Sequence, residues 1–98
     1  MNAKSHERQL KQALDAEGYT RTYVWEDGAN VHYPDHTHAQ DTAHIILQGE
    51  MALAMNGRSA RYHAGDRVDV PAGVVHTATM GSQGCRYLIG ERLPAQPP

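Results

Sequence analysis

Apolar residues recur at helical spacing up to Gly18 and fall in short extended runs after it. Within residues 1–18, Leu10 and Leu14 share one narrow stripe at helical spacing, and polar residues surround them. Ser5 is a candidate N-cap, and Gly18 is a candidate stop because glycine commonly ends helices. We therefore predict a short N-terminal helix that packs on the rest of the molecule.

Beyond Gly18 the chain reads as short strands separated by turns, starting with a β-branched and aromatic run at 19–25. Asn56-Gly57 separates two extended runs, and both residues tolerate positive φ, so the pair predicts a two-residue hairpin that joins 50–55 to 58–63. Short strands with frequent turns favour an all-β sandwich or small antiparallel barrel over residues 19–93. The proline-rich segment 94–98 is predicted to be a disordered tail.

Ile45, Ile46 and Leu47 follow one another in one of these runs, so apolar side chains lie on both faces of the strand. His44 and Ile46 face one way, which we take as the barrel interior. The opposite face needs the helix or a second subunit to cover it. We therefore expect a homodimer formed through a strand face or edge.

Charge, cysteine content and hydropathy argue against several classes of function. The chain has 98 residues and a net charge of −2, and its lysines and arginines are scattered, which argues against a nucleic-acid partner. Its single cysteine, Cys85, cannot form an internal disulfide. The polar N-terminus and the lack of a long apolar run indicate no signal peptide and no membrane span, so we expect a cytoplasmic location.

Histidines are concentrated in one region, where His32, His36, His38 and His44 fall within thirteen residues. If this segment is extended, His36 and His38 share a strand face and can converge on one metal ion. His44 has the same parity, whereas Pro34 separates His32 from that face and leaves it at the rim. A His-x-His pair alone is weak evidence, since exposed histidine pairs are common.

A second pattern has stricter spacing: Gly65, five residues, Pro71, one residue, Gly73, two residues, His76. Gly65 permits a tight turn into a strand. Pro71 and Gly73 form a turn in which glycine supplies positive φ, and that turn delivers His76 to a defined face of the next strand.

Together the two patterns resemble the two motifs of the cupin superfamily, in the form found in small single-domain microbial members. The resemblance implies a jelly-roll-like barrel with His36, His38 and His76 as metal ligands. It departs at the usual glutamate ligand, where this chain has Thr42, and at a later asparagine, where it has Met80. We predict that His44 replaces the glutamate as a fourth ligand; the alternative is a core histidine that binds nothing.

An imidazole-rich site without a carboxylate suits one divalent transition metal ion: Fe, Ni, Zn, Cu or Mn. Three histidines with open positions are also the pattern of cupins similar to cysteine dioxygenase. We therefore expect a metal-dependent, dioxygenase-like enzyme acting on a small polar or anionic molecule. No Asp or Glu falls at an inward position within the motifs, which weakens acid–base chemistry. The alternative is a non-catalytic protein that binds a small ligand or senses a metal.

Overall fold

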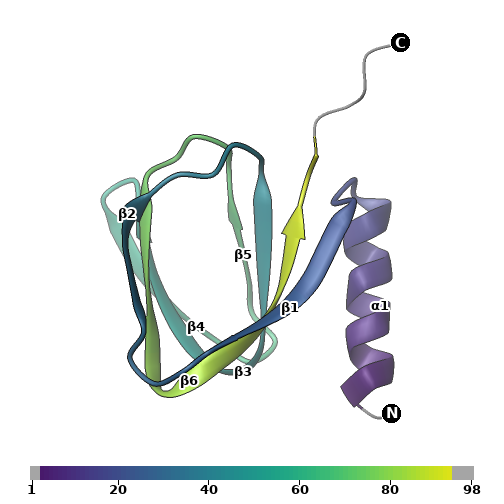
Figure 1. Ribbon diagram of the computed structural model, residues 1–98, viewed down its shortest axis with the longest axis horizontal. Coiled ribbons are helices and arrows are strands. Elements are labelled where there is room, and N and C mark those ends of the chain that lie inside the picture. Colours follow the sequence, from purple (N-terminus) through teal and green to yellow (C-terminus); the bar gives the residue numbers. More distant parts are fainter. Residues whose placement is uncertain (1–2, 94–98) are drawn as a thin grey trace.

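The computed structural model describes residues 3–93, so the predicted tail at 94–98 lies outside the described residues. One helix precedes six antiparallel strands (Figure 1). The elements are α1 (Ala3–Ala16), β1 (Arg21–Asp27), β2 (His32–His36), β3 (Thr42–Met55), β4 (Arg58–His63), β5 (Arg67–Val70) and β6 (His76–Glu91).

Strands β3 and β6 are long, pair with each other, and run through both halves of a barrel-like fold. The half of β3 near Thr42 pairs with the half of β6 near Glu91. This half of β3 also pairs with β5, and this half of β6 also pairs with β1. The half of β3 near Met55 pairs with the half of β6 near His76. Here β3 also pairs with β4, and β6 also pairs with β2. The all-β barrel-like fold with an N-terminal helix is therefore confirmed.

Strand β3 continues through Gly49, and strand β6 continues through residues 81–84. In each place one continuous strand passes through an irregularity in the β3–β6 pairing. Gly49 and Gly84 both have positive φ, and a Cβ on Gly49 would lie 2.2 Å from the carbonyl oxygen of Gly84. Two glycines thus let β3 and β6 bend at a place where a side chain on Gly49 would have no room.

The predicted hairpin is confirmed. Asn56 and Gly57 have φ of 54° and 75°, and Met55 pairs with Arg58 across the turn. Two positive φ values in succession give the turn that matches the twist of a two-residue hairpin.

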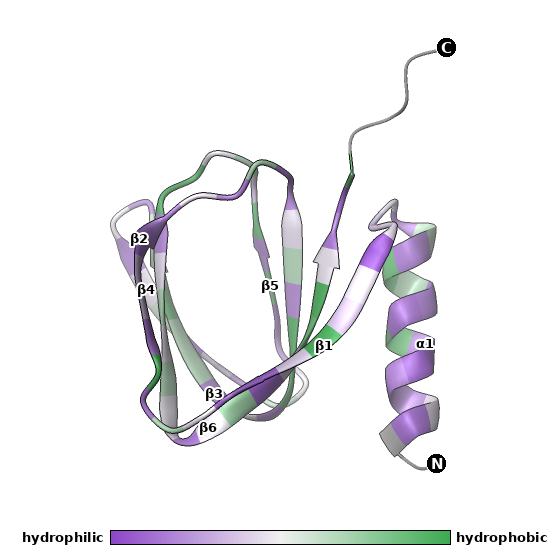
Figure 2. Cartoon of the chain, viewed as in Figure 1, coloured by the Kyte–Doolittle hydropathy of each residue, from purple (hydrophilic) through white to green (hydrophobic). Residues whose placement is uncertain are grey.

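The barrel interior and the helix side use opposite faces of β3. Ile46 packs inside with residues from both halves, including Met51, Leu53, Met80 and Tyr87. Ile45 packs on the other face with Leu14 of α1. Figure 2 shows the helix lying outside the barrel, with apolar positions on the side toward the strands. The helix thus covers the second apolar face, and the homodimer stays a prediction.

The end of α1 follows the sequence prediction, whereas its beginning does not. Gly18 has φ of 98°, its N–H bonds the carbonyl of Asp15, and the N–H of Tyr19 bonds that of Leu14. This is a Schellman motif, and the Leu14–Tyr19 contact accompanies it. Ser5 lies inside the helix, which includes Ala3, so its prediction as the N-cap was wrong. Among the described residues, no helix is long and apolar enough to cross a membrane.

Candidate metal centre

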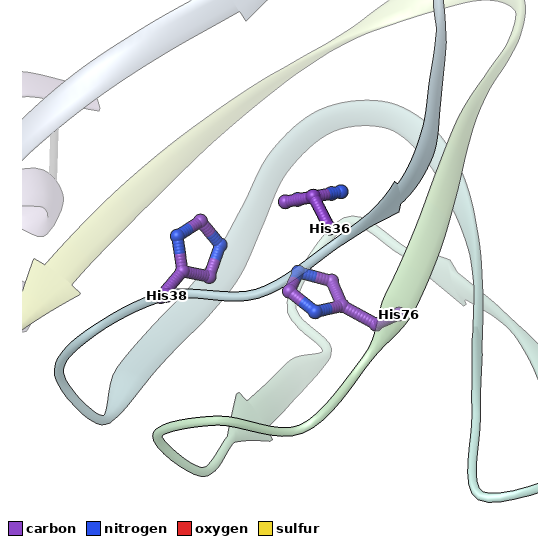
Figure 3. Close-up of side chains that lie close together, drawn as sticks. All are labelled: His36, His38 and His76. Atoms are coloured by element: carbon purple, nitrogen blue, oxygen red, sulfur yellow. The ribbon is translucent and has the colours of Figure 1, made fainter.

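Three of the predicted ligands meet at one end of the barrel (Figure 3). His36 is the last residue of β2 and His76 the first of β6, and the two are register partners. Their ring centroids lie 4.0 Å apart. The ring of His38 lies 5.1 Å from that of His36 and 4.9 Å from that of His76.

His38 reaches this cluster by a route that the sequence did not predict. Strand β2 ends at His36, so His38 is in the following loop and does not share a strand face with it. The carbonyl of His38 accepts a hydrogen bond from Gly73 N at 3.0 Å, and the carboxylate of Asp41 accepts one from Ala72 N at 2.8 Å. The two motif loops are therefore bonded to each other, which brings His38 close to His76.

The backbone sets the tautomer of two of these rings. Nδ1 of His36 lies 2.7 Å from the carbonyl oxygen of Pro34, and Nδ1 of His76 lies 3.0 Å from that of Val74. A carbonyl only accepts, so each Nδ1 carries the proton and each Nε2 offers a lone pair. Hydrogen bonds of this kind orient histidine ligands in metal sites.

The donor set fits a transition metal ion. The three histidines offer ligand nitrogens that all lie within 4.8 Å of one another. Small side-chain rotations would close them around one ion with bonds of about 2.0–2.1 Å. Partial burial, and then the neighbouring His76 and His36, lower the pKa of His38. The ring therefore stays neutral, as a metal ligand must be.

His44 lies near this cluster but outside the group of three. Its ring is 6.5 Å from that of His38 and 6.0 Å from that of Tyr87. Burial, and then His38 and His76, lower its pKa to about 4, so it is neutral at physiological pH. Its Nδ1 is buried and has no hydrogen-bond partner. Its assignment as a fourth ligand stays a prediction.

The remaining motif positions and histidines lie elsewhere. Thr42, at the usual glutamate position, is buried, and its hydroxyl donates to the Val70 carbonyl at 3.5 Å. His32 is exposed and bonds Thr79. His63 is exposed and pairs with Glu50 at 3.2 Å, so neither histidine is part of the cluster.

The histidines open onto a cavity of about 240 Å³ inside the barrel. We call His36, His38, His44 and His76 the histidine wall. Four other ring side chains line the same cavity, and we call three of them, Trp25, Tyr33 and Tyr87, the aromatic wall. The other lining residues are Tyr23, Met51, Leu53, Ala78 and Ile89.

Asp27 supports the aromatic wall from behind, and its role was not predicted from the sequence. Its carboxylate accepts hydrogen bonds from Tyr87 Oη at 2.7 Å, Tyr33 Oη at 2.8 Å and Trp25 Nε1 at 3.0 Å. The alternation Tyr23-x-Trp25-x-Asp27 was the available signal, since residues two apart in a strand share a face. It lies just before the histidine pattern and contains no recognised motif.

Residues 23–89 match the family model of the cupin domain, which is more than half of the chain. The chain belongs to the cupin family. No curated protein sequence matches it.

Solved structures agree with this assignment. A cupin superfamily protein from Desulfitobacterium hafniense has a TM-score of 0.68 at 19% identity, covering 74% of this chain and 66% of that one. KdgF from a Halomonas species has a TM-score of 0.66 at 16% identity, covering 74% and 68%. At these identities the likeness shows the fold alone.

A third structure is closer in sequence. The DMSP lyase DddQ from Ruegeria pomeroyi has a TM-score of 0.68 at 28% identity, and the match covers 79% of this chain. It covers only 40% of the lyase, so this chain corresponds to less than half of that protein.

Proposed function

We propose that this cupin holds one divalent transition metal ion through Nε2 of His36 and His76 and a ring nitrogen of His38. The observation that carries the proposal is the pair of Nδ1 hydrogen bonds to Pro34 and Val74, which leaves two lone pairs beside a third imidazole. Neutral imidazoles of this kind suit Fe, Ni, Zn, Cu or Mn. The prediction of His44 as a fourth ligand belongs to the same proposal and has its own test below.

We further propose that the bound ion serves a reaction on a small molecule held in the cavity. An ion in a three-histidine site supplies Lewis acidity and open coordination positions for an anionic or polar donor, and iron also supplies redox chemistry. The side chains of Met51, Leu53 and Ala78 give the same space an apolar surface. A dioxygenase-like reaction is the class that this arrangement supports best.

The protein groups around the cavity support metal-centred rather than acid–base chemistry. Among the described lining residues there is no Asp or Glu. Burial and the hydrogen bond to Asp27 raise the pKa of Tyr87, and the same causes raise that of Tyr33, so both hydroxyls stay protonated and are poor bases. The low pKa of His44 makes it a weak base as well.

The 28% identity to the DMSP lyase favours a second candidate, a metal-dependent lyase. Non-catalytic binding of a small ligand or of the metal is the third outcome. Oxygen uptake by the iron-loaded protein with a panel of small thiols, and loss of DMSP with the zinc- or iron-loaded protein, separate the three. Oxygen uptake supports the dioxygenase class, and DMSP loss supports the lyase. Tight metal binding with neither reaction supports plain binding.

Calorimetric titration of tag-free protein with Zn²⁺, Ni²⁺ and Fe²⁺ tests the metal site itself. We expect one ion per chain, and at least about a hundredfold weaker binding in His76→Ala because a ligand is removed. His63→Ala is the matched control, since this exposed histidine lies outside the cluster. His44→Ala tests the fourth-ligand prediction: weaker binding supports it, and unchanged affinity contradicts it. No binding by the wild type would overturn the proposal.

A further inference from the structure

The aromatic wall has a charge arrangement that points to one chemical class of ligand. The three rings of this wall all donate their polar hydrogens to the single carboxylate of Asp27, which is not among the residues that line the cavity. An acceptor that receives three donors matches an ionised carboxylate. The wall therefore consists of aromatic rings with a negative charge directly behind them.

Asp27 has no basic partner to neutralise that charge. Among residues 3–93, no Lys, Arg or His lies within ion-pair distance of its carboxylate, and the residue is only 9% exposed. The cavity lining of the described chain likewise contains no Lys or Arg. In a partly dry cavity such a charge is weakly screened, so the potential at the aromatic wall is negative.

Tyr23, the fourth aromatic residue of the cavity lining, shows the same preference. The guanidinium of Arg21 lies 5.4 Å from the ring centroid of Tyr23, and the Tyr23 hydroxyl donates to Glu91 at 2.8 Å. A ring bonded to a carboxylate therefore already holds a cation at the rim. The three rings bonded to Asp27 repeat this combination of ring and carboxylate, and none of them has an arginine recorded over its face.

We infer that the aromatic wall binds a compact methylated cation, such as a quaternary ammonium group, as one end of the small-molecule ligand. Rings attract cations through their negative faces, and quaternary ammonium groups have no N–H to satisfy. A primary ammonium group is a poorer fit, because three donors already occupy the oxygens of Asp27 and the cavity offers no replacement for lost hydration.

The position of the wall relative to the histidines defines the rest of the ligand. The Tyr33 ring lies 6.2 Å from that of His36, and the Tyr87 ring lies 6.0 Å from that of His44. A molecule with a cationic group on the aromatic wall and an anionic donor on the metal is therefore short, and it fits a 240 Å³ cavity. This second half of the inference rests on the proposed metal site, whereas cation binding does not.

Trp25 provides the readout, since it is the chain's only tryptophan and belongs to the wall. Metal-free protein is titrated with choline and with its neutral isostere 3,3-dimethylbutan-1-ol, and Trp25 fluorescence is followed. We expect choline to bind at least about fivefold more tightly than the isostere. Equal affinities, or no binding of choline, would overturn the inference.

Two variants test the role of Asp27. Asp27→Asn keeps the side-chain shape and removes the charge, so we expect it to lose the preference for choline. Glu26→Gln removes an exposed charge from the adjacent position of β1 and is expected to keep it. An unchanged preference in Asp27→Asn would contradict the inference. If that variant does not fold, Trp25→Leu replaces it, because Trp25 is half exposed; choline binding followed by calorimetry should then be lost.

Glycine betaine carries a carboxylate and a quaternary ammonium group, so it tests cation binding by the aromatic wall and anion binding by the metal in one molecule. Zinc-loaded protein should bind it more tightly than metal-free protein does, and equal affinities would contradict the placement of the anionic end. A protein that binds zinc but shows no preference for choline leaves the proposed function intact and overturns only the cation inference. A preference for choline without zinc binding supports the cation inference and overturns the proposed metal site.

Discussion

The histidine wall and the aromatic wall line one cavity, but of the hydrogen bonds described for their rings only that of Tyr87 joins distant segments of the chain. Nδ1 of His36 and of His76 each bond a carbonyl two residues earlier in the chain. The hydroxyl of Tyr87 instead bonds Asp27, sixty residues away in sequence. A local hydrogen bond belongs to a short motif, whereas a long-range one exists only after the strands have paired.

The two walls also differ in electrostatics. Burial, and then neighbouring imidazoles, lower the pKa values of His38 and His44 and favour their neutral forms. The carboxylate of Asp27 makes the aromatic wall negative, and burial beside it raises the pKa of Tyr87. One wall is therefore suited to receive a metal cation through nitrogen lone pairs, and the other to receive a cation through ring faces.

The largest effect should follow from disturbing the backbone that supports the aromatic wall. Gly84 has φ of 77°, and a Cβ there would lie 2.6 Å from the carbonyl oxygen of Asp27. Gly84→Ala adds conformational strain to a clash with backbone, so we expect it to lower the free energy of unfolding by roughly 4 kcal/mol in urea denaturation.

Gly57→Ala is its matched control. Gly57 has φ of 75°, and a Cβ there would meet no heavy atom within 4 Å, so only the strain remains, about 1–2 kcal/mol. Equal losses in the two variants would show that close packing of Gly84 on Asp27 does not matter.

The buried imidazole of the histidine wall should make stability depend on pH. The pKa of His44 is about 4 in the native state and about 6.5 in the unfolded chain, so between these values the unfolded chain binds the extra proton. Its contribution is therefore fully present above pH 6.5 and is lost as pH falls to about 4, a loss of about 3 kcal/mol.

Urea denaturation of metal-free protein at several pH values from 7 to 4.5 measures this loss. His44→Leu removes the titrating group and should flatten the curve relative to the wild type. Parallel curves for the two proteins would mean that His44 is not buried in its neutral form.

Removing one hydroxyl tests the aromatic wall without altering its rings. Tyr87→Phe deletes a buried hydrogen bond to a carboxylate, so we expect a loss of about 2 kcal/mol in stability. Tyr33→Phe deletes the equivalent bond from a half-buried ring and should cost about 1 kcal/mol. Zinc affinity should stay the same in both, and a tenfold change in either would show that the walls are coupled.

The smallest effect is expected for an exposed histidine. His63→Ala removes a contact with Glu50 whose histidine side chain is 61% exposed, so stability should change by less than about 0.5 kcal/mol. A larger loss, measured by urea denaturation, would mean that this surface pair supports the β3–β4 pairing more than its exposure implies.

Sequence alone predicted the features that depend on local geometry. The Asn56-Gly57 turn, the Gly18 helix end and the face shared by His44 and Ile46 each follow from a few neighbouring residues. The three clustered histidines came from motif spacing, although His38 reaches the cluster through a loop and not a strand.

What the sequence did not predict depends on contacts between distant segments. Gly49 lies between two apolar runs in sequence, and only its approach to Gly84 makes it a bend within one long strand. Asp27 follows the aromatic run at 19–25 and has no motif around it. Its three partners come from β1, β2 and β6 and are brought together only in the folded sheet.

The central claim is that His36, His38 and His76 bind one ion, with Nδ1 of the first and last still protonated. Long-range ¹H–¹⁵N NMR of the histidine rings during a Zn²⁺ titration tests it most directly. We expect the Nε2 resonances of His36 and His76 and one ring nitrogen of His38 to shift together and saturate at one equivalent, while those of His32 and His63 stay unchanged. Shifts confined to the exposed histidines, or loss of the Nδ1 protons of His36 and His76 on binding, would contradict it.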